Sequence, residues 1–317
     1  MIKLLKRLKS QGVLSINQRN SDFVLRYNPR KLYPLVDDKL KTKKLALEAK
    51  IAVPPLFDII ETEHQIKTLP QRLESYNDFV VKPARGSGGD GILVFTGKAF
   101  GRYRQINGKL TTSQELSYHL SCLLSGAYSL GGSSDYAIIE KRVVVDPVFA
   151  EVSYEGIPDI RIITLLGYPT MAMVRLPTRM SGGKANLHQG AIGVGVDLAT
   201  GKTLGGVFQN DTIDFHPDTL NPITGIEVPY WNEILEIASR CYDLTGLGYL
   251  GVDIVLDKDQ GPLMLELNAR PGLNIQIANR VGGLKRYRTV EARHQEFQGE
   301  TSTEKVAYCR KAFAAEK

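Results

Sequence analysis

Residues 263–279 read LMLELNARPGLNIQIAN, an apolar run that one acid and one amide interrupt. The apolar side chains from 263 to 267 predict a buried strand. Glu266 and Asn268 stand two positions apart, so both side chains point to the same face of that strand. Because an unpaired carboxylate is costly to bury, Glu266 should face a cation.

A second apolar run, GYLGVDIVL at residues 248–256, contains a single acid, Asp253. If the two strands lie side by side, Asp253, Glu266 and Asn268 point to one place. Such a set of oxygen ligands suits Mg²⁺, which leaves its other positions to phosphates and water. The alternative is an acid between strands that an arginine neutralises. Three oxygen-bearing side chains, followed by RPG at residues 270–272, favour the metal site.

The composition is that of a globular chain with a mild positive charge. The 317 residues are 43% hydrophobic, enough for one large core or two modest domains, and the formal net charge is +6. This charge suits anionic ligands as well as nucleic acid, so it does not decide between them. The three cysteines lie far apart without a CxxC pair. This spacing argues against a disulfide framework and a zinc site, and it predicts a cytoplasmic protein.

The first twelve residues, MIKLLKRLKSQG, are basic and amphipathic. They lack the apolar core and cleavage site of a signal peptide, and no run in the chain approaches the length of a membrane span. We therefore expect a surface helix here and no integral membrane segment; contact with a membrane surface or a partner is the alternative. The rest of residues 1–36 predicts short extended pieces around Phe23, Val24 and Leu25, too little for an independent domain.

A glycine-rich loop, ARGSGGDG at residues 84–91, follows a predicted strand at 78–83 and precedes another at 92–96. It matches the pattern GxGxxG. A dinucleotide-binding turn would need a helix after the loop, and a protein-kinase loop would need its lysine on the following strand. The sequence has neither. The remaining interpretation is a hairpin whose backbone N–H groups cover a triphosphate, with Lys82 on the strand before it.

The other predicted elements follow from hydrophobic periodicity and from turn residues. Helices are predicted at residues 37–53, 65–76, 113–124 and 230–245 and in a basic tail from 281. Strands are predicted at residues 56–60, 137–142, 157–164, 171–176 and 192–196. The lysines of the first helix predict a solvated face, with Lys39 as the exception. The strand at 137–142 runs into charge, and its end would offer backbone groups to a flat base near Glu140.

Two arginines, Arg161 and Arg175, each lie in an apolar strand. Such arginines usually pair with acids, whereas beside the acidic cluster they would neutralise phosphate. His188 lies in the glycine-rich loop at 182–191, where a histidine is more often a loop residue than a catalytic base. His188 and Asp159 are the candidates for a general base.

The order of these pieces resembles the ATP-grasp superfamily over about residues 37–280. The motifs that carry the resemblance are DDK, VKP, the glycine hairpin, IIEK, DIR, NLHQG and ELNARPG. DIR, NLHQG and ELNARPG are most similar to the α-L-glutamate ligase-like branch, related to the ligase that adds glutamate to a ribosomal protein. The resemblance implies an α+β fold in which two lobes clasp ATP, and a shortened N-terminal region. The implied division is a short segment at 1–36, a small lobe at 37–136, a large lobe at 137–280 and a helical tail at 281–317.

The resemblance also implies roles for single residues. Lys39 and Lys82 match the two nucleotide lysines. The residues that match the phosphate-covering hairpin are Gly86, Ser87, Gly88, Gly89 and Gly91. Those that match the adenine hinge run from Ile138 through Ile139, Glu140, Lys141 and Arg142 to Val143. The residues that match the magnesium ligands are Asp253, Glu266 and Asn268. Those that resemble groups near the transferred phosphate and the substrates are Arg161, Arg175, Asn186, His188 and Arg270.

The implied activity is that of a carboxylate–amine ligase that uses ATP and Mg²⁺, with Mn²⁺ as a substitute, and releases ADP. A carboxylate would take the γ-phosphate to become an acylphosphate, which an amine then attacks; glutamate is one candidate acid. The alternatives are a kinase or phosphotransferase on the same fold and a non-catalytic nucleotide-binding module of a complex. We expect a small-molecule or peptide substrate and no nucleic acid. Because about 36 residues replace the usual N-terminal domain, a second copy of the chain or a partner protein would complete the acceptor pocket.

Overall fold

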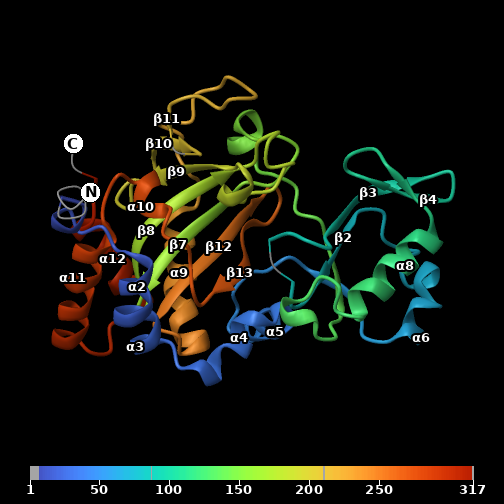
Figure 1. The fold of residues 1–317 in the computed structure, drawn as a ribbon, viewed down its shortest axis with the longest axis horizontal. Coiled ribbons are helices and arrows are strands. Elements are labelled where there is room, and N and C mark those ends of the chain that lie inside the picture. Colours follow the sequence, from blue (N-terminus) through green and yellow to red (C-terminus); the bar gives the residue numbers. More distant parts are fainter. Residues whose placement is uncertain (1–6, 87, 210, 316–317) are drawn as a thin grey trace. The chain divides into compact units, whose positions relative to one another are not determined.

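The computed structural model describes residues 7–86, 88–209 and 211–315. Its contacts divide the chain into two compact units, shown with all other elements in Figure 1. The small unit comprises residues 37–44 and 53–143, and the large unit comprises residues 1–36, 45–52 and 144–317. The predicted boundary at residue 136 stays a prediction. Helix α5 (Lys39–Glu48) contributes residues to both units.

The small unit is built on an antiparallel sheet of six strands in the order β1-β6-β2-β3-β4-β5. The strands are β1 (Leu56–Ile60), β2 (Phe79–Pro83), β3 (Leu93–Ala99), β4 (Arg102–Gln105), β5 (Leu110–Thr111) and β6 (Ala137–Glu140). Its helices are α6 (Glu63–Ile66), α7 (Leu69–Arg72), α8 (Ser113–Leu124) and the 3-10 turn η3 (Leu130–Gly132). Buried side chains of the sheet and of α8 form one core, in which the rings of Phe79, Phe95 and Tyr103 contact one another.

The large unit is built on an antiparallel sheet of seven strands in the order β11-β10-β9-β8-β7-β12-β13. The strands are β7 (Asp159–Leu165), β8 (Tyr168–Leu176), β9 (Ile192–Val196), β10 (Thr203–Phe208), β11 (Asp211–Ile213), β12 (Tyr249–Asp257) and β13 (Gly261–Asn268). The strands at the centre, β7, β8 and β12, are buried on both faces. The sheet therefore needs helices on both sides.

Helix α9 (Trp231–Thr245) packs against β7, β8, β12 and β13 with its apolar stripe, and ends at Gly246 in the left-handed conformation. The other helices are α10 (Ile275–Ala278), α11 (Gly283–Glu296), α12 (Ser302–Ala312) and the 3-10 turns η4 (Pro147–Val152) and η5 (Leu187–Gln189). Helix α10 contacts β8, β9 and β10. The two antiparallel sheets and their helices confirm the predicted α+β class.

The N-terminal segment is helical, so the predicted extended pieces around Phe23 are wrong. Its elements are α2 (Ile16–Gln18), the π-helix η1 (Arg19–Val24), α3 (Leu25–Tyr27), the 3-10 turn η2 (Arg30–Leu32) and α4 (Pro34–Asp37). Phe23 is fully buried, and its ring lies 4.9 Å from that of Tyr287 and 5.9 Å from that of Tyr249. Burial of this ring against the large unit, rather than local propensity, explains the helical path.

Three further differences concern single elements. The helix predicted at 65–76 is two short helices, α6 and α7, because Pro70 starts a new turn. The β4–β5 and β10–β11 hairpins were not predicted. The strand predicted at 137–142 ends at Glu140.

Within the described part of the chain, every helix is too short or too polar to cross a lipid bilayer.

Candidate functional site

The glycine-rich loop connects β2 and β3, which pair antiparallel with Phe79 opposite Phe95. Gly91 has a φ of +75°, and a Cβ atom there would lie 2.5 Å from the Tyr128 ring. The carbonyl oxygen of Gly91 also lies 3.0 Å from Nε2 of His119. Gly91 is therefore required for the close approach of the loop to these two rings. Ser87, predicted to belong to the same hairpin, lies outside the described residues.

Lys39 is tied to the beginning of this loop. Its ammonium group donates to the carbonyl oxygen of Gly86 at 2.5 Å, and its N–H donates to that of Ala84 at 2.9 Å. Asp38 caps the start of α5, where its Oδ1 accepts the N–H groups of Leu40 and Lys41 at 3.1 Å each. The structure thus brings one predicted nucleotide lysine to the predicted phosphate-covering loop.

Lys82, the second predicted nucleotide lysine, is buried on β2 and forms an ion pair with Glu140 on β6. A third group joins them, because Nζ of Lys43 lies 2.7 Å from Oε2 of Glu140. Lys43 belongs to the helix whose lysines were predicted to be solvated, and it is only 4% exposed. That prediction is therefore wrong for Lys43. Its spacing of four from Lys39 along one helix could have drawn attention to it.

The predicted adenine hinge runs from the end of β6 to Val143. Ile138 and Ile139 are fully buried, and the Lys141 N–H donates to the Pro55 carbonyl oxygen at 2.8 Å. Arg142 pairs with Asp78 at 3.1 Å. Beyond β6, the N–H groups of Arg142 and Val143 have no acceptor among the residues that the structure describes. They remain available to the edge of a base.

The predicted metal residues lie on paired strands of the large unit. Strands β12 and β13 are neighbours, with Asp253 opposite Glu266 and Gly251 opposite Asn268. Directly opposed residues of an antiparallel pair share one face. Nδ2 of Asn268 also donates to Oδ2 of Asp253 at 3.3 Å. The expected pairing of the two acidic strands is therefore found.

Two arginines reach the same face. Nε of Arg161 donates to Oδ1 of Asp253 at 2.6 Å, and its Nη2 donates to Oδ2. Arg175 holds Asp159 with two hydrogen bonds and reaches Oδ2 of Asp253 at 2.7 Å. Both arginines that were predicted to bind phosphate are thus bound to carboxylates in this structure. The alternative interpretation of the sequence, an acid that an arginine neutralises, is therefore also present.

The two acids in this cluster differ in their affinity for a proton. Burial raises the pKa of Asp159, and the charge of Asp253 adds to this effect against the opposing charge of Arg175. Burial also disfavours the charged form of Asp253, but Arg161 and Arg175 together hold its pKa below the usual range. Asp159 is therefore the acid of this cluster that accepts a proton more readily.

The oxygen chemistry of this face suits Mg²⁺. Asp253 and Glu266 provide carboxylates. The Asn268 amide donates a hydrogen bond to Asp253, so its side-chain oxygen is left as a ligand for a metal ion. The arginines share both oxygens of Asp253. Among the described residues, no group of three or more histidines, cysteines and acids is arranged around one point. The magnesium assignment stays a prediction.

Three other predicted residues lie at the surface or in loops. Asn186 caps the turn η5 by accepting the His188 N–H at 3.0 Å, and His188 itself is exposed. Arg270 is exposed, and its guanidinium group lies 5.1 Å from the centre of the Tyr33 ring. Their predicted contacts with substrate stay predictions.

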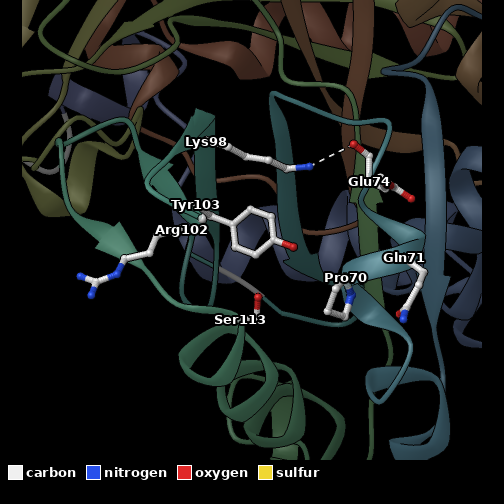
Figure 2. Close-up of a pocket in the computed structure, with 8 residues that line it drawn as sticks. Pro70, Gln71, Glu74, Lys98, Arg102, Tyr103 and Ser113 are labelled. Carbon is white, nitrogen blue, oxygen red and sulfur yellow. Dashed lines mark hydrogen bonds between the residues drawn. The ribbon is translucent and has the colours of Figure 1, made fainter.

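A pocket of about 320 Å³ in the small unit contains none of the predicted residues. Figure 2 shows its lining, in which Lys98 points across Tyr103 toward Glu74. The Lys98 ammonium group donates to the carbonyl oxygens of Leu73 at 2.9 Å and Glu74 at 3.1 Å. Because Lys98 already donates to backbone carbonyl oxygens of the small unit, we assign no function to this pocket.

A family model described as sugar-transfer associated ATP-grasp matches residues 18–292. The chain belongs to this family. As a sugar-transfer associated ATP-grasp protein it has the ATP-grasp fold, which confirms the predicted superfamily. The match begins at residue 18, within the segment that the sequence motifs had left outside the resemblance. The narrower glutamate ligase branch stays a prediction.

Solved structures resemble this ATP-grasp protein at low sequence identity. Pyruvate carboxylase of Rhizobium etli has a TM-score of 0.51 at 12% identity, over 91% of this chain and 21% of that one. D-cycloserine synthetase DcsG has a TM-score of 0.47 at 14% identity, over 84% and 72% of the two chains. The ATP-grasp ligase PsnB, complexed with a minimal precursor, has a TM-score of 0.44 at 13% identity, over 84% and 63%. The chain thus spans less than two thirds of PsnB, and these likenesses concern the fold alone. No curated protein sequence matches the chain.

Proposed function

We propose that this ATP-grasp protein is an ATP- and Mg²⁺-dependent carboxylate–amine ligase that releases ADP and works through an acylphosphate. The observation that carries the proposal is the shared face of β12 and β13, where Asp253, Glu266 and Asn268 stand together in a chain of the ATP-grasp family. The glycine loop with Lys39 and Lys82 in the small unit supports it.

The charged residues of the chain would have different roles in binding the nucleotide and its phosphates. Transfer of phosphate to a carboxylate brings two anions together, so fixed cations must offset their repulsion. Lys39, Lys82 and the glycine loop would hold the triphosphate, and the hinge near Val143 would receive the adenine. Arg161 and Arg175 would exchange part of their bonds to Asp253 for phosphate oxygens.

Asp253, Glu266 and Asn268 would hold the magnesium ion, which when bound supplies positive charge to the phosphates. Asp159, whose pKa is raised by burial, is the candidate acceptor for the proton of the amine. The family's association with sugar transfer supports amino sugars as acceptors to be tested beside amino acids and peptides.

The test is ADP release from the full chain with a panel of carboxylic acids and amines. We expect ADP formation that requires both substrates, and a loss of at least about a hundredfold in kcat for Glu266→Gln, the size seen for removal of a group that offsets transition-state charge. Glu233→Gln, at an exposed position of α9, is the matched control.

Four outcomes contradict the proposal or part of it. AMP as the product rules out the acylphosphate route. A stable phosphorylated product without any need for an amine identifies a phosphotransferase instead. Unchanged turnover in Glu266→Gln removes the metal assignment, and ATP binding without turnover on any substrate pair favours the non-catalytic module.

A further inference from the structure

Lys43 holds a buried position that the proposed function does not use. It lies one helical turn after Lys39 on α5, and its ammonium group donates to the Pro54 carbonyl oxygen. It also lies 2.7 Å from Oε2 of Glu140, while Lys82 binds Oε1 of the same carboxylate. The side chains of Lys43, Lys82 and Glu140 are 4–6% exposed. A lysine this deeply buried needs a reason, because long charged side chains are rarely buried without a full set of partners.

The charges of Lys43, Lys82 and Glu140 do not cancel. Two ammonium groups and one carboxylate leave a net charge of +1, and Glu140 is the acid that pairs with either lysine among the described residues of the small unit. Burial lowers the pKa of Lys43 more than Glu140 raises it, and the charge of Lys82 adds to the lowering. Burial works against the charge of Glu140 too, but the two lysines hold its pKa below the usual range. A surplus of positive charge is thus built into the interior next to Lys82.

We propose that Lys43 is a positioning residue that shares Glu140 with Lys82, so that Lys82 keeps a positive charge which Glu140 alone would cancel. The surplus charge then attracts the phosphates of the nucleotide. The inference rests on the proposed function, because it assumes that Lys82 meets an anionic nucleotide. It predicts that removing Lys43 weakens the binding of phosphates and leaves the binding of the base unchanged.

A purely structural role makes a different prediction. If Lys43 only fastened α5 to the carbonyl of Pro54, its loss would weaken the binding of ATP and of adenosine alike. Lys43→Gln, whose amide group can still donate a hydrogen bond, would then lose less affinity than Lys43→Met. In the charge-sharing role both substitutions remove the surplus positive charge, so both should weaken ATP binding equally.

The experiment measures the binding of ATP and of adenosine to the full chain by isothermal titration calorimetry, with folding checked by circular dichroism. For Lys43→Met we expect ATP affinity to fall by about tenfold or more, since one unit charge acts through a poorly polarisable interior. Adenosine affinity should stay within about twofold, a difference of less than 0.5 kcal/mol on the scale of ~1.4 kcal/mol per tenfold. Lys43→Gln should lose as much ATP affinity as Lys43→Met, and Lys43→Arg should retain it.

The outcomes separate this inference from the proposed function. If the unaltered chain binds no ATP, the proposed function fails and this inference fails with it. If the unaltered chain binds ATP and Lys43→Met binds it equally well, only the inference is overturned. Parallel losses for ATP and adenosine, or ATP affinity that Lys43→Gln retains and Lys43→Met loses, also overturn it. Should Lys43→Met fail to fold, the folded Lys43→Gln variant decides: a loss of ATP affinity with unchanged adenosine affinity supports charge sharing, and unchanged ATP affinity refutes it.

Discussion

One buried carboxylate of the large unit, that of Asp257, is held by backbone N–H groups. At the end of β12 its oxygens accept the N–H groups of Val144 at 2.9 Å and of Asp259 and Gln260 at 3.0 Å each. Burial opposes the charged form, yet these bonds together bring the pKa of Asp257 below its ordinary value of 3.8. The turn between β12 and β13 therefore depends on the ionised form.

This dependence gives a pH-dependent prediction. The folded chain binds the Asp257 proton less tightly than the unfolded chain, so the stabilisation is fully present above the unfolded pKa and is lost as pH falls through the folded value. We expect Asp257→Asn to lower the free energy of unfolding by about 1–3 kcal/mol near pH 7, the cost of an unsatisfied buried donor. The difference in the free energy of unfolding between Asp257→Asn and the unaltered chain should become smaller below pH 4. Urea denaturation at both pH values measures it, with the exposed Asp259→Asn as control; a gap that stays constant with pH would refute the account.

At the scale of residues, sequence reasoning found the acids better than the lysines. Asp253 and Glu266 stood out because each is the single charge in an apolar strand, and the structure places them opposite each other. Lys43 did not stand out among the lysines of α5, although its spacing of four from Lys39 places both residues on one side of the helix. The sequence also did not show that Arg161 pairs with Asp253. The two residues lie opposite each other only because of the register in which β7 pairs with β12.

At the scale of elements, the β2–β3 hairpin depends on contacts as much as on backbone freedom. Gly88 and Gly91 both have positive φ, of +67° and +75°. A Cβ at Gly88 would meet nothing within 4 Å, whereas one at Gly91 would meet the Tyr128 ring. The two positions therefore separate backbone strain from steric contact.

We expect Gly88→Ala to cost roughly 1 kcal/mol of stability, the strain of a left-handed alanine. Gly91→Ala should cost about 1–3 kcal/mol more, because the methyl group must displace a packed ring. Thermal unfolding of the two variants measures the difference, and ATP titration shows whether the loop has moved. Equal stability of the two variants would mean that Tyr128 does not anchor the loop.

Elements with strong periodicity were predictable, and elements defined by pairing were not. The α9 helix and strands β7, β8, β9 and β12 follow from apolar patterns within their own residues. The β4–β5 hairpin had a usable signal in Asn107-Gly108, a common hairpin turn, within a stretch too polar to suggest strands. Strands β10 and β11 contain glycine and short polar pieces, and they form because β9 offers an edge.

At the scale of the whole molecule, the N-terminal segment is part of the core of the large unit. Besides the packing of Phe23, the Asn28 side chain donates to the carbonyl oxygens of Tyr249 at 2.7 Å and Ala269 at 2.8 Å. Figure 1 shows α2 and α3 in blue beside elements from the red end of the sequence, and Arg26 pairs with Glu291 of α11. No local pattern could reveal these partners, which lie more than 200 positions away.

Phe23→Ala tests this integration. We expect a loss of about 3–5 kcal/mol in the free energy of unfolding, typical of a large ring removed from a core. Leu25→Ala, at a position that is 65% exposed, is the control and should change it by less than about 0.5 kcal/mol. Guanidinium denaturation followed by tryptophan fluorescence of Trp231, the single tryptophan, reports on the large unit. A small effect of Phe23→Ala on the free energy of unfolding would show that the N-terminal segment contributes little to the stability of the large unit.

The path of the chain between the two units has a practical consequence. The backbone passes from one unit to the other at residues 36/37, 44/45, 52/53 and 143/144, and the second passage falls inside α5. A single protease nick at any passage would leave the halves linked covalently elsewhere. Anyone who wishes to graft the small unit onto a relative must therefore transplant its two separate segments together, with the helix that joins them.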